Sequence, residues 1–292
     1  MAAEEPRSPC ADADGGGSCG PEALPAALAA SLRCAGPFEA SEVDVEVLEA
    51  ERSYPEEVAS AAARHWAELV AQKPRSFDGL VWTLAGWSVE PVAGTRRRRV
   101  TLRLQRSSYR FATYTHFSPQ ALSLAPEHRC NVIGIGALTL TAEGLLIVGR
   151  RAMHLAMMAG MWSFVPCGVL DEPCPLAVLR KESEEELGIG PEDVRDFWCL
   201  GIFDCGEEQG HCFNMVFAQQ LRRSARELCL SHEGASDRAE HAEVRCLRPE
   251  AALELEPGTH ALKQAVLAFL HLGPSRPFPA DGEKRGEEEE GP

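Results

Sequence analysis

Apolar and polar residues alternate along this chain with two different periods, which together predict an α/β protein. Residues 43–47 alternate valine with acidic residues, the two-residue period of a half-buried strand. From Pro55 to Gln72 the apolar residues recur at helical spacing, and proline is common at the start of a helix. Residues 77–89 and 98–105 have the composition of two further strands. The basic run 96–99 is typical of a turn, with a phosphate-attracting patch as the alternative.

The second half of the chain continues this alternation. Residues 132–151 hold two apolar segments that meet at the turn signal Ala-Glu-Gly, and residues 160–168 predict the next strand. Residues 198–204 and 212–219 predict a hairpin around Gly-Glu-Glu-Gln-Gly-His. His211, at the end of that hairpin, is typical of a solvated turn histidine, although a metal or substrate contact is the alternative.

These patterns divide the chain into four parts. We expect a disordered tail at 1–37, with a short helix over 23–33, because Ala, Gly, Pro and acidic residues dominate there. An α/β extension is expected at 38–125. A larger α/β domain is expected at 126–272; it ends with a polar insertion at 224–238, a strand at 239–247 and an amphipathic helix at 259–272. The acidic tail at 273–292 is again predicted to be disordered.

A helix predicted at 175–187 concentrates negative charge on one side. Pro175 and Gly188 mark its ends, and Glu182, Glu185 and Glu186 lie within an arc of about 100°. Like charges spaced three and four residues apart weaken a helix, so we expect a cation to compensate them. Mg²⁺ binds oxygen ligands and is commonly shared between carboxylates and substrate phosphates. A solvated acidic face is the alternative that the charge run alone leaves open.

The residues around these glutamates resemble the signature of the Nudix hydrolases, G-x5-E-x7-R-E-U-x-E-E-x-G-U, in which U is aliphatic. The three glutamates, Gly188 and Ile189 match its E-x-x-E-E-x-G-U end, and Gly168 is similar to its first glycine. The predicted strands before the helix also resemble those that lead into the signature, so the similarity covers residues 132–247. The resemblance implies an α/β/α sandwich with a mixed sheet over 126–272, following the α/β extension.

The match to this signature is incomplete. Lys181 stands where the signature has arginine, Ser183 where it has an aliphatic residue, and Cys167 where a second glycine is common. The loop before the helix is one residue short, which leaves Glu172 as the nearest acid to the signature's first glutamate. Lysine keeps the charge of arginine but lacks its planar fork. These departures bear on the activity rather than on the fold.

The resemblance implies a role for each candidate residue, with Mg²⁺, or Mn²⁺, as the cofactor. The implied metal ligands are three carboxylates and one backbone carbonyl: Glu182, Glu185, Glu186 and the carbonyl of Gly168. Lys181 would support the acids by pairing with Glu185, four residues on. Many Nudix proteins have an acidic loop before a strand such as 239–247, and one of its acids can act as general base or as a further ligand. Glu240 and then Glu243 are the candidates here. Arg150 and Arg151 close a strand from which they could face the site, with solvated strand-end cations as the alternative.

The segment 107–117 combines aromatic and cationic side chains. A strand end followed by a packed aromatic loop is one interpretation; a nucleotide site, with Tyr109 for stacking and Arg110 for a phosphate, is the other. Trp66 and the segments 76–78 and 108–110 are similar to the N-terminal region of the Nudix branch that hydrolyses UDP-glucose. This narrower resemblance implies UDP-glucose or UDP-galactose as the substrate, with UMP and a sugar 1-phosphate as products.

Charge and cysteine usage restrict the partners. The 292 residues include 44 acidic and 29 basic side chains, a net charge of −15, which does not favour nucleic acid or an anionic membrane as partner. The 11 cysteines include no C-x-x-C pair, and the N-terminus lacks a signal-peptide pattern. The uncharged run 152–170 is more typical of a loop with a buried strand than of a membrane span. We predict reduced thiols and a cytoplasmic protein.

The primary prediction is therefore a Nudix-type pyrophosphohydrolase that acts on a nucleoside diphosphate linked to another moiety. A non-catalytic Nudix module that binds a nucleotide or a protein is the alternative from another class, favoured by Lys181, Ser183 and the short loop. Three mutually repelling acids argue against it, because a binding-only site does not need them. Within the enzyme prediction, ADP-ribose, dinucleotide and CoA substrates stay open.

Overall fold

The computed structural model describes residues 24–74, 76–121, 123–155, 157–206 and 210–272. Its helices are α1 (Ala26–Ser31), α2 (Glu56–Gln72), α3 (Tyr109–Phe117), α4 (Pro175–Leu187), α5 (Ala225–Gly234) and α6 (His260–Leu272). Its first strands are β1 (Leu32–Phe38), β2 (Val43–Val47), β3 (Leu80–Pro91), β4 (Arg98–Ser108), β5 (Ile133–Leu140) and β6 (Leu146–Arg151). The later strands are β7 (Trp162–Phe164), β8 (Cys167–Val169), β9 (Val194–Asp204), β10 (Phe213–Leu221) and β11 (His241–Leu247).

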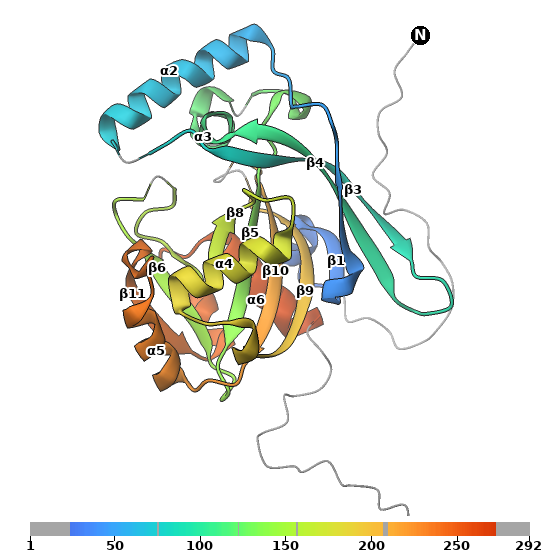
Figure 1. The fold of residues 1–292 in the computed structure, drawn as a ribbon, viewed down its shortest axis with the longest axis vertical. Helices are drawn as coiled ribbons and strands as arrows, with labels where there is room; N and C mark the ends of the chain where they lie inside the picture. The colour runs from blue at the N-terminus through green and yellow to red at the C-terminus, as the bar shows by residue number, and fades with distance from the viewer. Residues whose placement is uncertain (1–23, 75, 122, 156, 207–209, 273–292) are drawn as a thin grey trace, which may run out of the picture.

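The larger sheet is mixed and lies between two helices. Its strand order is β1-β9-β10-β5-β6-β11, with β7 beside β6 and β8 beside β5. β10 runs parallel to β5, and the other pairs are antiparallel. Helix α4 covers one face and α6 the other (Figure 1). The predicted α/β/α sandwich with a mixed sheet is confirmed.

The alternation of side chains along β5 explains how both faces are covered. Ile133 and Ile135 are in the same buried cluster as Val178 of α4. Leu138 is in a second cluster with Leu262 of α6. Successive side chains of a strand point to opposite faces, so an apolar strand of this kind fits a sheet that is buried on both sides.

A smaller sheet, in the order β2-β4-β3, forms the predicted α/β extension together with α2 and α3. Leu102 and Leu104 of β4 are fully buried in the cluster that also contains Ile135 and Phe217 of the larger sheet. The backbone N–H of Trp82 donates to the carbonyl of Leu170 at 2.9 Å, a direct bond between the two parts. The extension and the larger domain therefore share one hydrophobic core.

The prediction of a disordered tail over 1–37 is wrong for the part of it that the structure describes. There β1 is formed and pairs with β9 at the edge of the larger sheet, whereas α1 lies within the short helix predicted over 23–33. Leu28 of α1 is 0% exposed and Phe38 of β1 is 1% exposed, so both elements pack against the rest of the protein. Residues 1–23 and 273–292, where disorder was also predicted, lie outside the described residues.

Two further segments differ from the expectation. Residues 109–117 form the helix α3 rather than an aromatic loop, because Tyr114 is buried against Val58 and Ala62 of α2. The insertion 224–238 contains α5, which begins with a capping box: Ser224 Oγ accepts from the Glu227 N–H, and the Ser224 N–H donates to the Glu227 carboxylate. The other predicted strands and helices form within a few residues of their predicted bounds. No helix among the described residues is long and apolar enough to cross a membrane.

Candidate active site

Helix α4 presents its glutamates toward β8 and β11. Its buried apolar residues include Val178, Leu179 and Leu187. Glu182 lies against Gly168 of β8, and Glu186, which is also buried, contacts Cys167 of β8 and His241 of β11. Gly168 of β8 allows Glu182 to approach the backbone, because a Cβ on that residue would lie 2.4 Å from the Glu182 carboxylate oxygen. The glycine of the signature is therefore needed here for space.

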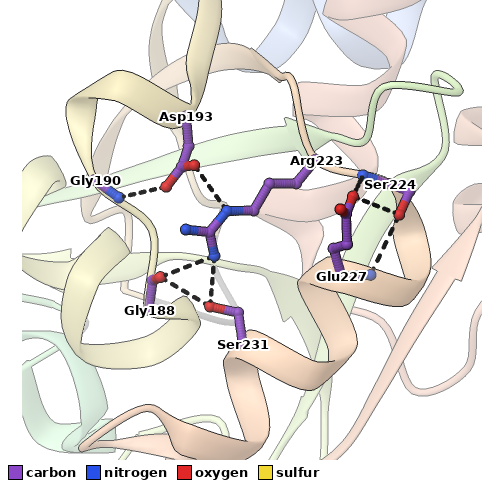
Figure 2. A network of polar contacts seen from close by, with 7 residues as sticks. All are labelled: Gly188, Gly190, Asp193, Arg223, Ser224, Glu227 and Ser231. Carbon is purple, nitrogen blue, oxygen red and sulfur yellow. Dashed lines mark hydrogen bonds and ion pairs between the residues drawn. The ribbon is translucent and has the colours of Figure 1, made fainter.

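A network of polar contacts fixes the end of α4 that carries Glu186 (Figure 2). Arg223 Nε donates to Asp193 Oδ1 at 2.7 Å, and its Nη1 donates to the Gly188 carbonyl at 3.2 Å and to Ser231 Oγ at 2.8 Å. The second oxygen of Asp193 accepts from the Gly190 N–H at 2.9 Å. Gly188 itself has φ of 62°, the left-handed conformation that ends many helices. One guanidinium thus joins the end of α4 to α5 and to the start of β9.

Glu186 is the most deeply buried acid of the site, at 1% exposure. Its Oε1 accepts from the Cys167 N–H at 3.1 Å, and its Oε2 lies 2.7 Å from His241 Nε2. Burial raises the pKa of Glu186 to about 8, although the hydrogen bond from Cys167 opposes that rise. The carboxyl is therefore held in place by two bonds at a depth that disfavours its negative charge.

Glu182 shares this environment. Burial, followed by the charge of Glu186, raises the pKa of Glu182 to about 8, and Lys181 opposes the rise only in part. Two buried carboxyls with too little positive charge nearby form a site that a cation would stabilise. Among the described residues no group of three or more His, Cys, Asp or Glu side chains is arranged as a complete metal site. Mg²⁺ does not need one, because it commonly uses one or two carboxylates together with waters and substrate phosphates.

A cavity of about 280 Å³ opens beside these acids. Its polar lining includes Tyr109, Arg151, Gly168, Glu182 and Glu240. A second cavity of about 650 Å³ adjoins it, lined by residues 72–74, 76–77 and 79–81 of the extension and by the loop 153–155. The two cavities share Tyr109, Leu155, Val169 and Glu182.

Arg151 supplies the positive charge of the smaller cavity. Its Nε donates to the Met157 carbonyl at 3.2 Å, and its Nη1 donates to Cys167 Sγ at 3.3 Å. Burial opposes its charge, but Cys167, Glu240 and Glu186 raise the pKa of Arg151, so it remains a cation. Burial also raises the pKa of Tyr109, which keeps that phenol neutral. The structure places both of these predicted substrate-binding residues at the cavity.

Glu240, the first candidate for general base, also lies there. It ends the short 3-10 turn Arg238–Glu240, just before β11, and its backbone carbonyl accepts from the Ala152 N–H at 2.7 Å. Its charge raises the pKa of Glu186 and that of Glu182. Glu243, the second candidate, is bonded to Arg245 at 2.6 Å on the surface and lines neither cavity.

Other predicted residues lie away from the cavities. Arg110 is not among the lining residues: its backbone N–H donates to Asp78 Oδ1 at 2.8 Å, and its Nε lies 3.6 Å from Asp78 Oδ2. Arg150 is exposed and donates to the Gly160 carbonyl at 3.0 Å. Glu185 is half-buried and Glu172 is exposed, and neither lines a cavity.

The predicted pairing of Lys181 with Glu185 is wrong. Lys181 Nζ donates to Asp171 Oδ2 at 3.0 Å, and this hydrogen bond is the main reason that the pKa of Lys181 is raised. Asp171 follows β8 in the short loop, and it reaches Lys181 from outside the helix. A contact between neighbouring elements has thus replaced the expected contact within α4.

The sequence analysis did not identify His241. It lies between Glu240 and Glu243, in a stretch where only the acids were considered, and its spacing gives no sign of a contact with Glu186. In the structure its side chain has 0% exposure, and burial followed by the charge of Arg151 lowers its pKa to about 4. A second histidine, His232 of α5, approaches the backbone carbonyl of Glu186 with its Nδ1 at 2.7 Å.

Comparison with known protein families identifies the larger domain. Residues 131–269 match the family model described as the NUDIX domain, close to the predicted range of 126–272. A search of curated protein sequences finds no match. The predicted Nudix domain is confirmed, and pyrophosphohydrolase is the enzyme class that such a domain indicates.

Solved structures with a similar fold include several proteins of this family. A mutT/nudix family protein from Listeria innocua is 20% identical, with a TM-score of 0.37 over 48% of this chain and 93% of that chain. An Ap4A hydrolase from C. elegans is 18% identical, with a TM-score of 0.31 over 48% and 97%. The NUDIX domain of Shewanella oneidensis NrtR, complexed with ADP ribose, is 14% identical, with a TM-score of 0.36 over 55% and 96%. Likenesses of this size carry no argument about the substrate of this chain.

Proposed function

Since residues 131–269 of this chain are a Nudix domain, we propose that the protein is a metal-dependent hydrolase that cleaves the pyrophosphate bond of a nucleoside diphosphate linked to another moiety. One observation carries the proposal. Glu182 lines the smaller cavity together with Arg151 and Glu240, and Glu186 lies behind it, bonded to the Cys167 N–H; burial raises the pKa of each of these two glutamates to about 8. Acids beside the fixed guanidinium of Arg151 suit a substrate whose phosphates bind together with a metal ion.

The donors present fit Mg²⁺ or Mn²⁺. The groups that would hold the ion are oxygen donors on α4 and β8: Glu182, Glu186 and the carbonyl of Gly168. Glu185, the third carboxylate that the resemblance implies, lines neither cavity. When bound, the metal would supply charge neutralisation at the phosphates and acidify bound water. Its charge would also offset the repulsion between the two buried carboxyls, which otherwise favours their protonation.

The protein's own residues would bind and orient the substrate. Arg151 is a cation in the smaller cavity, and its guanidinium N–H groups can donate to two phosphate oxygens. Glu240 lines the same cavity on a loop that precedes β11, where its carboxylate can take the proton of an attacking water. The proposed roles are thus phosphate binding for Arg151 and general base for Glu240.

The larger cavity offers room for the remainder of the substrate. It lies between the extension and the Nudix domain, shares Tyr109 with the smaller cavity, and has Phe77, 78% exposed, at its edge. Tyr109 also meets Trp66 edge to face, with ring centroids 6.2 Å apart. These are residues on which the resemblance to the UDP-glucose branch rests, and their position beside the site supports UDP-glucose or UDP-galactose as the best candidate substrate.

The test is hydrolysis of UDP-glucose by the purified protein with Mg²⁺, scored for UMP and glucose 1-phosphate. UDP-galactose, ADP-ribose, a dinucleotide and CoA complete the panel. Glu186→Gln should lower turnover by about 100-fold or more, a size typical for the loss of one electrostatic group of an active site. Glu184→Gln is the matched control, because Glu184 is exposed on the same helix and occupies a position that the signature leaves unspecified. Equal turnover in the two variants would rule out the assignment of Glu186.

A non-catalytic module is the second candidate, favoured by the two protein donors that already bind the Glu186 carboxylate. Titration with Mn²⁺ separates the two functions without a substrate. The hydrolase should bind the ion in the native protein and lose affinity in Glu186→Gln. A protein with no turnover on the panel and no Mn²⁺ binding would be the module.

A further inference from the structure

Of the ion pairs between described residues, the pair of His241 and Glu186 is the most deeply buried. The side chains are 0% and 1% exposed, and His241 Nε2 lies 2.7 Å from Glu186 Oε2. They come from different elements, β11 and α4, 55 residues apart in the chain. A polar pair that is excluded from water to this degree stabilises the protein only if its geometry is well satisfied.

The surroundings of the imidazole indicate which nitrogen carries the proton. His241 Nδ1 is buried and has no hydrogen-bond partner. A buried N–H without an acceptor is rarer than a buried acceptor without a donor. The neutral ring with its proton on Nε2 is therefore the favoured form, and Nε2 donates to the Glu186 carboxylate.

Glycine at position 149 makes room for the ring in this orientation. Gly149 lies on β6, next to β11, and a Cβ there would be 2.3 Å from His241 Nδ1 and 2.7 Å from Val165 Cγ2. The imidazole thus packs directly on the backbone of β6. Strand β6 therefore limits how far the ring can move away from Glu186.

We propose that His241 is a positioning residue, which holds the Glu186 carboxylate in the orientation that binds the metal. The proposal rests on the proposed function. A carboxylate has about four lone-pair sites on its two oxygens, so two N–H donors leave about two sites for a cation. With Cys167 N–H on Oε1 and His241 on Oε2, the carboxylate cannot rotate about its last bond without breaking one of them.

This role has a physical consequence for metal binding. A carboxylate that is already oriented loses less conformational freedom when the ion binds. Partners that orient a metal ligand are commonly worth 10- to 100-fold in metal affinity or activity, to an order of magnitude. His241 would act through Glu186 alone, and it would not touch the substrate or the reacting atoms.

The experiment measures Mn²⁺ affinity in the absence of substrate, by the loss of the EPR signal of free Mn²⁺, for the full chain and its variants. His241→Leu removes the donor, and we expect its affinity to fall by roughly 10- to 100-fold. His241→Gln should restore most of it, because the amide nitrogen of glutamine reaches about as far as Nε2. His241→Asn has the same chemistry but its nitrogen lies near the position of Nδ1, so it should stay impaired.

Two further variants test the positioning role without creating a cavity at position 241. Gly149→Ala should weaken Mn²⁺ binding as well, because its methyl group displaces the ring while both partners stay intact. His271→Leu, an exposed histidine of α6, is the matched control and should bind as the native protein does. If His241→Leu does not fold, the comparison of the Gln and Asn variants decides, since equal affinities in these two would overturn the role.

The result also separates this inference from the proposed function. If Glu186→Gln binds Mn²⁺ as tightly as the native protein, the proposed metal site itself is wrong. If Glu186→Gln loses the ion while His241→Leu keeps it within about twofold, below the range for an orienting partner, only the positioning role is wrong. Loss in both, with rescue by glutamine, supports both.

Discussion

The carboxyls of Glu182 and Glu186 show how strongly burial can change a residue that a signature would treat as a simple anion. Each has its pKa raised to about 8 from an ordinary value of 4.5. Burial is the leading cause for both, and the nearby acids add to it. The native protein without metal therefore binds protons at these positions where the unfolded chain does not.

This difference predicts a fall in stability with rising pH. The contribution of Glu182 and Glu186 to the free energy of unfolding is complete below pH 4.5 and is lost as the pH rises through about 8. The buried His116 and His241 have pKa values lowered from 6.5 to about 4, so they make stability rise with pH. They do so only below pH 6.5, because above it they are neutral in the unfolded chain as well. In EDTA the melting temperature should thus fall between about pH 7 and pH 8.

Two controls identify the groups responsible for that fall. The double variant Glu182→Gln, Glu186→Gln should lose the slope of melting temperature against pH, because neither amide titrates. Saturating Mg²⁺ should raise the melting temperature of the native protein most at the higher pH, where both acids release their protons to bind it. A native protein with the same slope as the double variant would contradict the assignment.

At the scale of elements, the position of Glu186 depends on how α4 ends. Gly188 reverses the chain, and Arg223 then binds the Gly188 carbonyl, Ser231 and Asp193 together. The side chain of Asp193 is only 12% exposed, so its charge relies on that guanidinium. These contacts of Arg223, called the clamp below, link the end of the signature helix to two other elements of the domain.

Arg223→Leu should destabilise the protein by about 1–3 kcal/mol, the usual cost of leaving a buried polar group without its partner. Equilibrium unfolding in urea measures the change. Arg222→Leu is the matched control, because Arg222 is the exposed neighbour. The expected result is a lower midpoint for Arg223→Leu alone; equal midpoints would show that Asp193 and Gly188 do not depend on the clamp.

At the scale of the whole molecule, the extension and the Nudix domain share one hydrophobic core. Leu102 of the small sheet is 0% exposed in a cluster with residues of α4, β5 and β10. His116 of α3 also reaches across, with its Nδ1 3.1 Å from the Gly210 carbonyl ahead of β10. The larger cavity is formed from both parts, so its shape depends on their packing.

Leu102→Ala should therefore weaken the whole protein rather than the extension alone. We expect a loss of about 2–5 kcal/mol, typical of a fully buried leucine. Leu230→Ala, at a leucine that is 58% exposed, is the control and should have little effect. Urea unfolding followed by tryptophan fluorescence and by circular dichroism should give one coincident transition. Separate transitions for the two probes would mean that the extension unfolds independently.

Local signals explain which parts of the fold and the site could be predicted. Helix α4 was predicted with its observed bounds because Pro175 and Gly188 act within their own turns of the chain. The three glutamates were found because helical spacing alone brings them to one side. Glu240 was found through the resemblance and Arg151 from its place at the end of a predicted strand, and the structure places both at the cavity.

The predictions that the structure contradicts share a different cause. The strand β1 and the helix α3 form where local propensity predicted disorder or a loop, because partners distant in the chain bury them. Lys181 pairs with Asp171 across a loop, and Arg110 pairs with Asp78, more than 30 residues earlier in the chain. No periodicity within a segment encodes such contacts.

The sequence by itself determined the helix that carries the glutamates, since helical spacing acts locally, and its resemblance to the Nudix signature determined the fold and the enzyme class. Only the tertiary structure decided which cations and donors meet those acids: Arg151 at the cavity, Arg223 at the helix end and His241 on Glu186. It also decided how deeply the acids are buried and hence how they titrate. The reason is physical: burial and contacts between elements depend on the packing of segments far apart in the chain, which local patterns do not specify.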